Sequence, residues 1–392
     1  MHNAKIHKIK NPFIYGEVVT GENFIDRQEE LEMLEKDLLN GQILFLLSPR
    51  RYGKTSLIYN LFNKLKQKGA LTVLVDLYRC ASLQQFLTQY LNLLLKIGET
   101  KLEKISRFVN ELLPSIRPRL SIASDGTLNA EFFLSPIEKD LSKVIEEIID
   151  FPQKIANRWK KPICIAFDEF QEIRNFNGEK IEKTIRSIIQ HHRNVGYVFA
   201  GSKRHIIRDM ILREDGAFYK AGKIINLGKI DQRTFTRFLK EKFEEAGFNI
   251  TGEVIEAIFN ITNGCPYYIQ YISHELWDNY LDTKIVEKEQ LQAVLDKIVA
   301  EASPIYITIW DEFTLAQRRL LQAIALSGGK NIFSQEFVLR HELTSASSVQ
   351  TSANLLVERG ILEREDGEFL IEDMFFKYWI LKYGVPYSRK ID

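Results

Sequence analysis

Residues 48–55 read Ser-Pro-Arg-Arg-Tyr-Gly-Lys-Thr and follow an apolar run, Ile43–Leu47. The apolar run predicts a buried strand, and Ser56–Lys68 has the spacing of a helix. A loop between such elements turns its backbone N–H groups inward and adds the dipole of the helix, which favours an anion. Lys54 would reach the β- and γ-phosphates of a nucleotide, and Thr55 would offer its hydroxyl to Mg²⁺. The spacing therefore predicts a phosphate-binding loop (P-loop).

The loop fits the pattern G-x-x-x-x-G-K-[ST] at every fixed position except the first, which is Ser48. Serine is small enough for the tight turn, and Pro49 restricts φ beside it. Gly53 would let the backbone approach the phosphates. The alternative is a chance Gly-Lys-Thr on a surface turn, which the strand before it and the helix after it disfavour. The predicted nucleotide contacts are Ser48, Pro49, Arg50, Arg51, Tyr52, Gly53, Lys54, Thr55 and Ser56.

Two carboxylates, Asp168 and Glu169, follow a second apolar run, Ile163–Phe167. Ligands of α/β proteins bind at the carboxyl ends of parallel strands, so both acids should lie beside the P-loop. Asp168 would hold Mg²⁺ together with Thr55, and Glu169 would act as general base towards the attacking water. The alternative is an acidic pair that only caps a strand. With a P-loop upstream, the catalytic interpretation is favoured.

A third apolar run, Tyr197–Ala200, ends in Gly201-Ser202. In ATPases with a glutamate after the magnesium-binding aspartate, a strand lies between the P-loop strand and the acidic strand, and a polar residue at its tip senses the γ-phosphate. Ser202 is the candidate for that role, against an ordinary turn serine. The basic side chains on the following segment, Lys203, Arg204 and Arg208, fit a solvated helix face, and no arginine finger is assigned.

The chain that must position these groups alternates short apolar runs with helical patterns up to about residue 229. Near-continuous apolar strands of this kind predict a parallel sheet with helices on both faces, and therefore an α/β P-loop NTPase core. A hairpin is expected from Arg119–Ile122 and Thr127–Phe132, turned by Asp125-Gly126. We expect the core to span residues 1–229.

Beyond Leu227 the patterns are helical only. Phe235–Gly247, Val254–Ile261 and a helix begun by Pro266 predict an all-α lid over residues 230–305. Leu315–Ala325, Ser334–His341 and Ser347–Arg359, followed by two short strands around Asp366-Gly367, have the layout of a winged helix-turn-helix. The third predicted domain therefore spans residues 306–392.

Composition limits the partners. The 392 residues include 53 Lys+Arg and 52 Asp+Glu, so the whole protein has no basic field of the kind that dedicated nucleic-acid binders carry. The three cysteines are far apart and form no disulfide or zinc pattern. Residues 1–10 lack the apolar core of a signal peptide, and no apolar run has the length of a membrane span. A cytoplasmic protein without a membrane partner is expected.

Several motifs together resemble a known family. They are Asn11-Pro12-Phe13, Phe24–Leu31, Ser48–Ser56, Asp168–Gln171, Gly201-Ser202, Gly264–Tyr268 and Glu372–Trp379. In combination they are similar to archaeal and bacterial AAA-like P-loop ATPases of the STAND-related, ASCE class. The resemblance covers nearly the whole chain and implies an ATPase core, a helical lid and a C-terminal winged helix.

The same resemblance extends the site. It implies that the segment around Arg27 lies over the adenine and that Gly264-Cys265-Pro266 is the lid motif that closes on the nucleotide. The alternative for Pro266 is a helix start after a helix stop. Ser48 departs from the family pattern, as does Asp26, which stands where many relatives carry glycine. The expected ligands are ATP and Mg²⁺; the guanine-reading Asn-Lys-x-Asp of GTP-binding proteins is absent from the sequence.

Three functions remain in view. The first is an ATP-driven conformational switch of the STAND type with slow Mg²⁺-dependent hydrolysis and a protein partner at the C-terminal domain. The second is a DNA-associated ATPase like origin-recognition or transposition-helper proteins. It is not favoured, because the expected recognition helix, Ser347–Asn354, has no basic residue for phosphate contacts. The third is a regulatory module with little turnover, against which the Asp168-Glu169 pair argues.

Overall fold

A computed structural model of the chain describes residues 10–25, 27–97, 111–113, 119–122, 128–131, 141–365 and 367–385. The chain divides into two compact units. The first, called the sheet unit, comprises Ile14–Phe235 and Gly264–Tyr267. The second, called the helical unit, comprises the described residues of Met1–Phe13, Thr236–Asn263 and Tyr268–Asp392. In the described ranges, no helix is long and apolar enough to cross a membrane.

The sheet unit is built on five parallel strands in the order β2-β5-β6-β1-β7. Strand β6 lies between β1 and β5, as predicted for the strand that ends at Ser202. The strands are β1 (Ile43–Leu47), β2 (Leu71–Asp76), β5 (Ile163–Asp168), β6 (Val195–Gly201) and β7 (Lys223–Asn226). The helices of this unit include α1 (Gln28–Leu39), α2 (Lys54–Gln67), α3 (Leu83–Lys96), α5 (Leu141–Trp159), α6 (Arg174–Ile189) and α7 (Arg204–Leu212).

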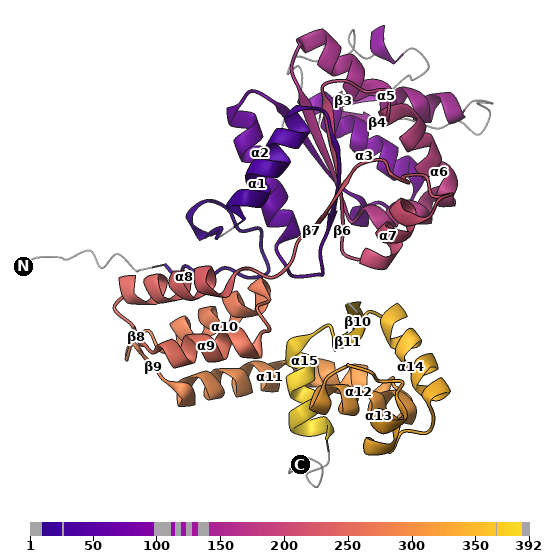
Figure 1. The fold of residues 1–392 in the computed structure, drawn as a ribbon. Coiled ribbons are helices and arrows are strands. Elements are labelled where there is room, and N and C mark those ends of the chain that lie inside the picture. Colours follow the sequence, from indigo (N-terminus) through magenta and orange to yellow (C-terminus); the bar gives the residue numbers. More distant parts are fainter. Residues whose placement is uncertain are drawn as a thin grey trace, which may run out of the picture. The chain divides into compact units, whose positions relative to one another are not determined.

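Helices cover both faces of this sheet, as Figure 1 shows. One face packs on α1 and α2 through an apolar cluster. The other packs on α3, α5, α6 and α7 through a second, larger cluster. Because both faces are covered, β5 is buried at all six positions, which explains the unbroken apolar run before Asp168. The predicted α/β P-loop NTPase fold is confirmed.

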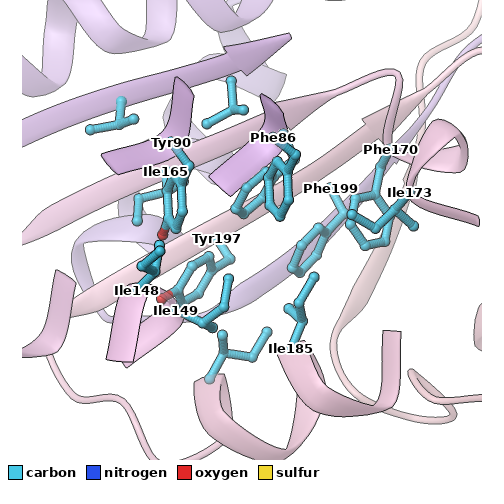
Figure 2. Packing of buried hydrophobic residues seen from close by; sticks show 14 of the residues in the cluster. Phe86, Tyr90, Ile148, Ile149, Ile165, Phe170, Ile173, Ile185, Tyr197 and Phe199 are labelled. Carbon is cyan, nitrogen blue, oxygen red and sulfur yellow. The ribbon is translucent and has the colours of Figure 1, made fainter. Parts of the chain in front are cut away.

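The larger cluster also fixes the turn that follows β5. A short 3-10 helix, η3 (Phe170–Ile173), carries two fully buried side chains, Phe170 and Ile173. Figure 2 shows both beside Phe199 of β6, and the Phe170 and Phe199 rings are 4.4 Å apart between centroids. Aromatic packing of this kind holds the chain after Asp168 firmly against the neighbouring strand.

The predicted hairpin is present as two antiparallel strands, β3 (Arg119–Ile122) and β4 (Leu128–Glu131). Its predicted turn, Asp125-Gly126, lies outside the described residues, as do Asp26 and Asp366.

The helical unit begins with the segment expected to form the lid. Its elements are α8 (Gln232–Glu245), β8 (Asn249–Ile250), α9 (Gly252–Ile261), α10 (Pro266–Asn279), β9 (Ile285–Val286) and α11 (Lys288–Asp311). Pro266 is the first residue of α10, where its missing N–H has no helical partner to lose. The N-terminal segment is tied to this bundle, since Asn11 Nδ2 donates to His274 O and Asp278 Oδ1. Phe13 packs against Trp277 at 5.8 Å between ring centroids.

The rest of the helical unit has the predicted winged-helix order of three helices and a hairpin. The elements are α12 (Leu315–Ser327), α13 (Gln335–Arg340), α14 (Ala346–Glu358), β10 (Leu362–Glu365), β11 (Glu368–Ile371) and α15 (Met374–Trp379). The predicted boundary between residues 305 and 306 falls inside α11, a continuous helix of 24 residues that sequence periodicity did not reveal. The division into three domains stays a prediction.

Candidate functional site

The P-loop joins the end of β1 to the start of α2. Two of its residues have left-handed backbones, Arg51 with φ 68° and Gly53 with φ 81°. Glycine adopts this conformation without a steric cost, and the turn that it permits lets α2 begin at Lys54. The loop therefore points the N-terminus of a 14-residue helix at the space where a phosphate would bind.

Ser48, which replaces the first glycine of the motif, is fully buried. Its backbone N–H donates to Gly201 O at 3.3 Å, which ties the loop to the end of β6. Its hydroxyl donates to Pro49 O at 3.0 Å. Because the buried hydroxyl has a hydrogen-bond acceptor within the loop, the fold accommodates serine at this position.

Lys54 is buried, with 6% of its surface exposed, and its ammonium group bridges both strand-end acids. Its Nζ lies 2.7 Å from Glu169 Oε1 and 3.1 Å from Asp168 Oδ1. A charge at such a position needs partners of opposite charge, because water does not solvate it. The prediction that β5 brings its two acids to the P-loop therefore agrees with the geometry.

Thr55 and Asp168 place two oxygen atoms that could bind a metal ion next to Lys54. Thr55 Oγ1 donates to Asp168 Oδ2 at 2.7 Å, and Asp168 Oδ1 accepts from the backbone N–H of Glu169 at 2.9 Å. Hydroxyl and carboxylate oxygens are the ligands that Mg²⁺ prefers, and it commonly keeps several waters besides. The residues at this position therefore fit a magnesium ion bound through one carboxylate and one hydroxyl.

Glu169 has a left-handed backbone, with φ 52°, at the start of η3. Its two carboxylate oxygens have different partners. Oε1 accepts from Lys54, whereas Oε2 accepts from Gln171 Nε2 at 2.5 Å and from Ser202 Oγ at 2.7 Å. Burial raises the pKa of this carboxyl, but the charge of Lys54 and the hydrogen bonds outweigh burial and lower the pKa to about 2. The carboxylate is ionised at neutral pH.

Ser202 is buried at the tip of β6, between the P-loop strand and the acidic strand. Besides its hydroxyl, its backbone N–H points at Glu169 Oε2, at 3.4 Å. The structure thus brings together Lys54, Thr55, Asp168, Glu169 and Ser202, all five side chains that were predicted to act on phosphate, water or metal.

The remaining loop residues differ in exposure. Pro49 is buried, Tyr52 is half-buried, and Arg50 and Arg51 are exposed. The hydroxyl of Ser56 accepts from Val19 N at 3.0 Å, so it anchors the segment that precedes α1.

Arg27, predicted to lie over the adenine, is buried and has a left-handed backbone with φ 72°. Its guanidinium donates to Glu30 Oε1 at 2.9 Å and to Gly228 O at 2.5 Å. Arg27 therefore joins the start of α1 to the chain that leaves β7. Its adenine contact stays a prediction.

The motif around Pro266 belongs to the sheet unit although the helix that it starts does not. Arg51 O accepts from Tyr267 N at 3.4 Å and from Cys265 Sγ at 3.6 Å. The Arg51 guanidinium lies 5.3 Å from the centre of the Tyr267 ring, a cation–π geometry. Pro266 thus sits between two residues that contact the P-loop.

Sequence reasoning missed two features of this site. Tyr267 and Gln171 were each included only as part of a family motif. The signal for Gln171 was its place two residues after Glu169, the predicted base. Tyr267 gave no comparable signal, since its partner is 216 positions earlier, in the P-loop (267 − 51).

Comparison with known proteins agrees with this geometry. The model of an ATPase domain predominantly from Archaea matches residues 24–272, well over half of the chain. The model of a probable winged helix domain matches residues 304–382. The comparison with curated proteins found no match.

The solved structures that share the fold at low sequence identity include the following two. A Walker-type ATPase of Pyrococcus abyssi is 18% identical, with a TM-score of 0.63 over 94% of this chain and 99% of that one. The ORC2 protein of Aeropyrum pernix, solved in ADPNP–ADP complexes, is 11% identical, with a TM-score of 0.51 over 90% of this chain and 92% of that one.

Proposed function

Because the chain belongs to the family of ATPase domains found predominantly in Archaea, we propose that it binds Mg²⁺-ATP, hydrolyses it slowly and changes conformation with the nucleotide. The observation that supports this most is the bridge from Lys54 to both Asp168 and Glu169. The bridge joins a phosphate-binding group to a metal ligand and a general base in one buried cluster.

Phosphate binding requires Lys54 to exchange partners. In the structure its ammonium group serves the two carboxylates, yet it is also the side chain that would meet the β- and γ-phosphates. When the ammonium turns to the phosphates, Glu169 loses the one cationic partner that it has among the described residues. Its Oε1 then accepts a hydrogen bond from water, and Glu169 acts as general base.

The hydrolytic step assigns one task to each side chain. Glu169 takes a proton from the water whose oxygen attacks the γ-phosphorus, while the bond from that phosphorus to the bridging oxygen breaks and releases ADP. Ser202 holds Glu169 and would sense the transferred phosphoryl group. Thr55 and Asp168 would hold Mg²⁺, which would supply positive charge to the phosphates.

The switch rests on the contact between Arg51 and Tyr267. Arg51 is part of the loop that must fit the phosphates, and Tyr267 is in the first turn of α10. A change in the loop backbone would therefore move the start of a helix that continues into the helical unit. This route supports a switch of the STAND type.

The surface of the winged helix fits a protein partner better than it fits DNA. Helix α14, over Ala346–Glu358, contains no lysine or arginine. Arg359 is the next residue, and its Nη1 lies 3.9 Å from Glu312 Oε2. Without cations, the helix lacks the phosphate contacts that supply most affinity for DNA. We propose that this domain contacts a protein.

The test is nucleotide binding and steady-state hydrolysis, with and without Mg²⁺, for the wild type, Lys54→Ala and the matched control Lys66→Ala. Lys66 is exposed on the same helix α2. We expect the affinity of Lys54→Ala for ATP to fall by at least about a hundredfold and that of Lys66→Ala to equal the wild type. Wild-type binding by Lys54→Ala would overturn the proposed function.

A further inference from the structure

Gln171 contacts the proposed base, Glu169, but has no task in the mechanism above. Resting on the proposed function, we propose that Gln171 is a positioning residue that holds Glu169 Oε2, so that Oε1 is the atom that faces the attacking water. The assignment follows from the hydrogen bonds of the carboxylate, the orientation of the Gln171 amide and the space that the fold leaves for it.

The two carboxylate oxygens of Glu169 differ in whether their hydrogen-bond partners stay when ATP binds. Oε2 is held by Gln171 Nε2 and by the hydroxyl and N–H of Ser202, all of which are neutral and fixed to the chain. Oε1 is held by Lys54, the one partner that must leave when phosphates bind. After that exchange, Oε2 keeps its donors and Oε1 is freed, so the carboxylate stays in place with one defined oxygen available.

The amide of Gln171 can face Glu169 in one way only. Its Nε2 donates at 2.5 Å, and the reverse orientation would set a carbonyl oxygen against the carboxylate oxygen at that distance. This orientation leaves the oxygen of the amide in an unfavourable position. Gln171 Oε1 is buried and has no hydrogen-bond partner among the described residues. Leaving a buried carbonyl unpaired is unfavourable, which indicates that the donor side of the amide is the side that is used.

The fold keeps a space for this amide at Gly201. A Cβ at that position would lie 2.3 Å from Gln171 Oε1 and 2.2 Å from Ile207 Cδ1, closer than atoms pack. Gly201 ends β6, directly before Ser202. The absence of a side chain there lets Gln171 and Ser202 reach the same oxygen from adjacent positions.

The backbone that carries Gln171 is rigidly packed. Its neighbour Phe170 and the next apolar residue, Ile173, are inserted into the aromatic cluster beside Phe199 (Figure 2). Gln171 itself is only 4% exposed, which leaves it few alternative conformations. A donor held this firmly restricts the carboxylate more than a solvated one would.

The experiment is a double-mutant cycle on the full chain, built on single-turnover ATP hydrolysis. Gln171→Met removes the hydrogen-bond donor Nε2 and keeps the length of the side chain. Gln171→Glu keeps the shape but puts a carboxylate oxygen in the place of that donor. Each is made in the wild type and in Glu169→Gln. The matched control is Gln317→Met, because Gln317 is equally buried in a helix cap of α12. ATP affinity and thermal unfolding are measured for every variant.

We expect both Gln171 variants to slow hydrolysis by at least about tenfold, the loss of one hydrogen bond to a charged group, with ATP affinity unchanged. In the Glu169→Gln background, neither should slow it further, and Gln317→Met should hydrolyse like the wild type. Equal losses in both backgrounds, a changed ATP affinity alone, or a wild-type rate would overturn the positioning role. A wild-type rate for Glu169→Gln itself would instead overturn the proposed base, and the present inference with it.

Discussion

Lys54 and Glu169 are 115 residues apart in the sequence, and the structure joins them at 2.7 Å between Nζ and Oε1. The lysine comes from the first turn of α2 and the glutamate from the turn after β5. Their contact sets the order of events in the proposed cycle, because the phosphate-binding group must leave the base before the base can meet water. Binding and catalysis are thereby linked through one ion pair.

Removing the hydroxyl of Thr55 should weaken the magnesium site selectively. Thr55→Val keeps the shape of the side chain but loses the bond to Asp168 Oδ2. We expect the Mg²⁺ concentration for half-maximal hydrolysis to rise by about tenfold, because one oxygen ligand is lost. A titration of hydrolysis with Mg²⁺ measures this.

The matched control is Thr184→Val, which removes a hydroxyl that donates to Lys180 O within helix α6. It should leave the magnesium titration unchanged. An unaltered midpoint for Thr55→Val would remove Thr55 from the metal site.

Removing the ring of Tyr267 should uncouple the nucleotide from the conformational change. Tyr267→Ala loses the contact with the Arg51 guanidinium, whereas Tyr267→Phe keeps the ring. Limited proteolysis with and without ATP reports the change. We expect a nucleotide-dependent cleavage pattern in the wild type and Tyr267→Phe, and the same pattern with and without ATP in Tyr267→Ala. Full protection of Tyr267→Ala by ATP would argue against this route.

Helix α14 should not bind DNA by itself. It has exposed polar side chains such as Gln350 and Asn354 but no cation to anchor them on a phosphate backbone. Fluorescence anisotropy with duplex DNA at low and moderate salt should show no salt-dependent binding. Tight binding that disappears when Gln350 and Asn354 are replaced by alanine would contradict a protein partner at this surface.

The ion pair of Glu169 should make stability depend on pH. Its pKa is lowered from 4.5 to about 2, so ionised Glu169 stabilises the fold above about pH 4.5, and this contribution is lost as the pH falls towards 2. We expect the wild type to exceed Glu169→Gln in free energy of unfolding by about 1–3 kcal/mol more at pH 7 than at pH 3. Urea unfolding at the two pH values measures the difference. An equal difference at both would show that the folded protein does not lower this pKa.

The sequence was sufficient for features that are local along the chain. Ser48–Thr55 lies between a predicted strand and a predicted helix, and the acids stand at the end of β5, so topology alone brings Lys54, Asp168 and Glu169 together. The winged-helix layout is equally local, since its first three helices, α12, α13 and α14, each follow a capping serine or threonine.

Features that depend on side-chain conformation were out of reach. The division of the two Glu169 oxygens between Lys54 and Gln171 follows from a left-handed backbone at residue 169 and from the missing side chain at Gly201. The bond from Arg27 to Gly228 depends on the path of the chain after β7. Neither is encoded in periodicity or motif spacing, because both arise from packing between segments far apart in the sequence.

The central claim is that the P-loop cluster hydrolyses ATP with Glu169 as general base, and single-turnover hydrolysis by Glu169→Gln tests it most directly. ATP binding is measured in the same sample. The geometry predicts that the variant binds ATP like the wild type and hydrolyses it at least about a hundredfold more slowly. Hydrolysis at the wild-type rate would contradict the assignment of the base.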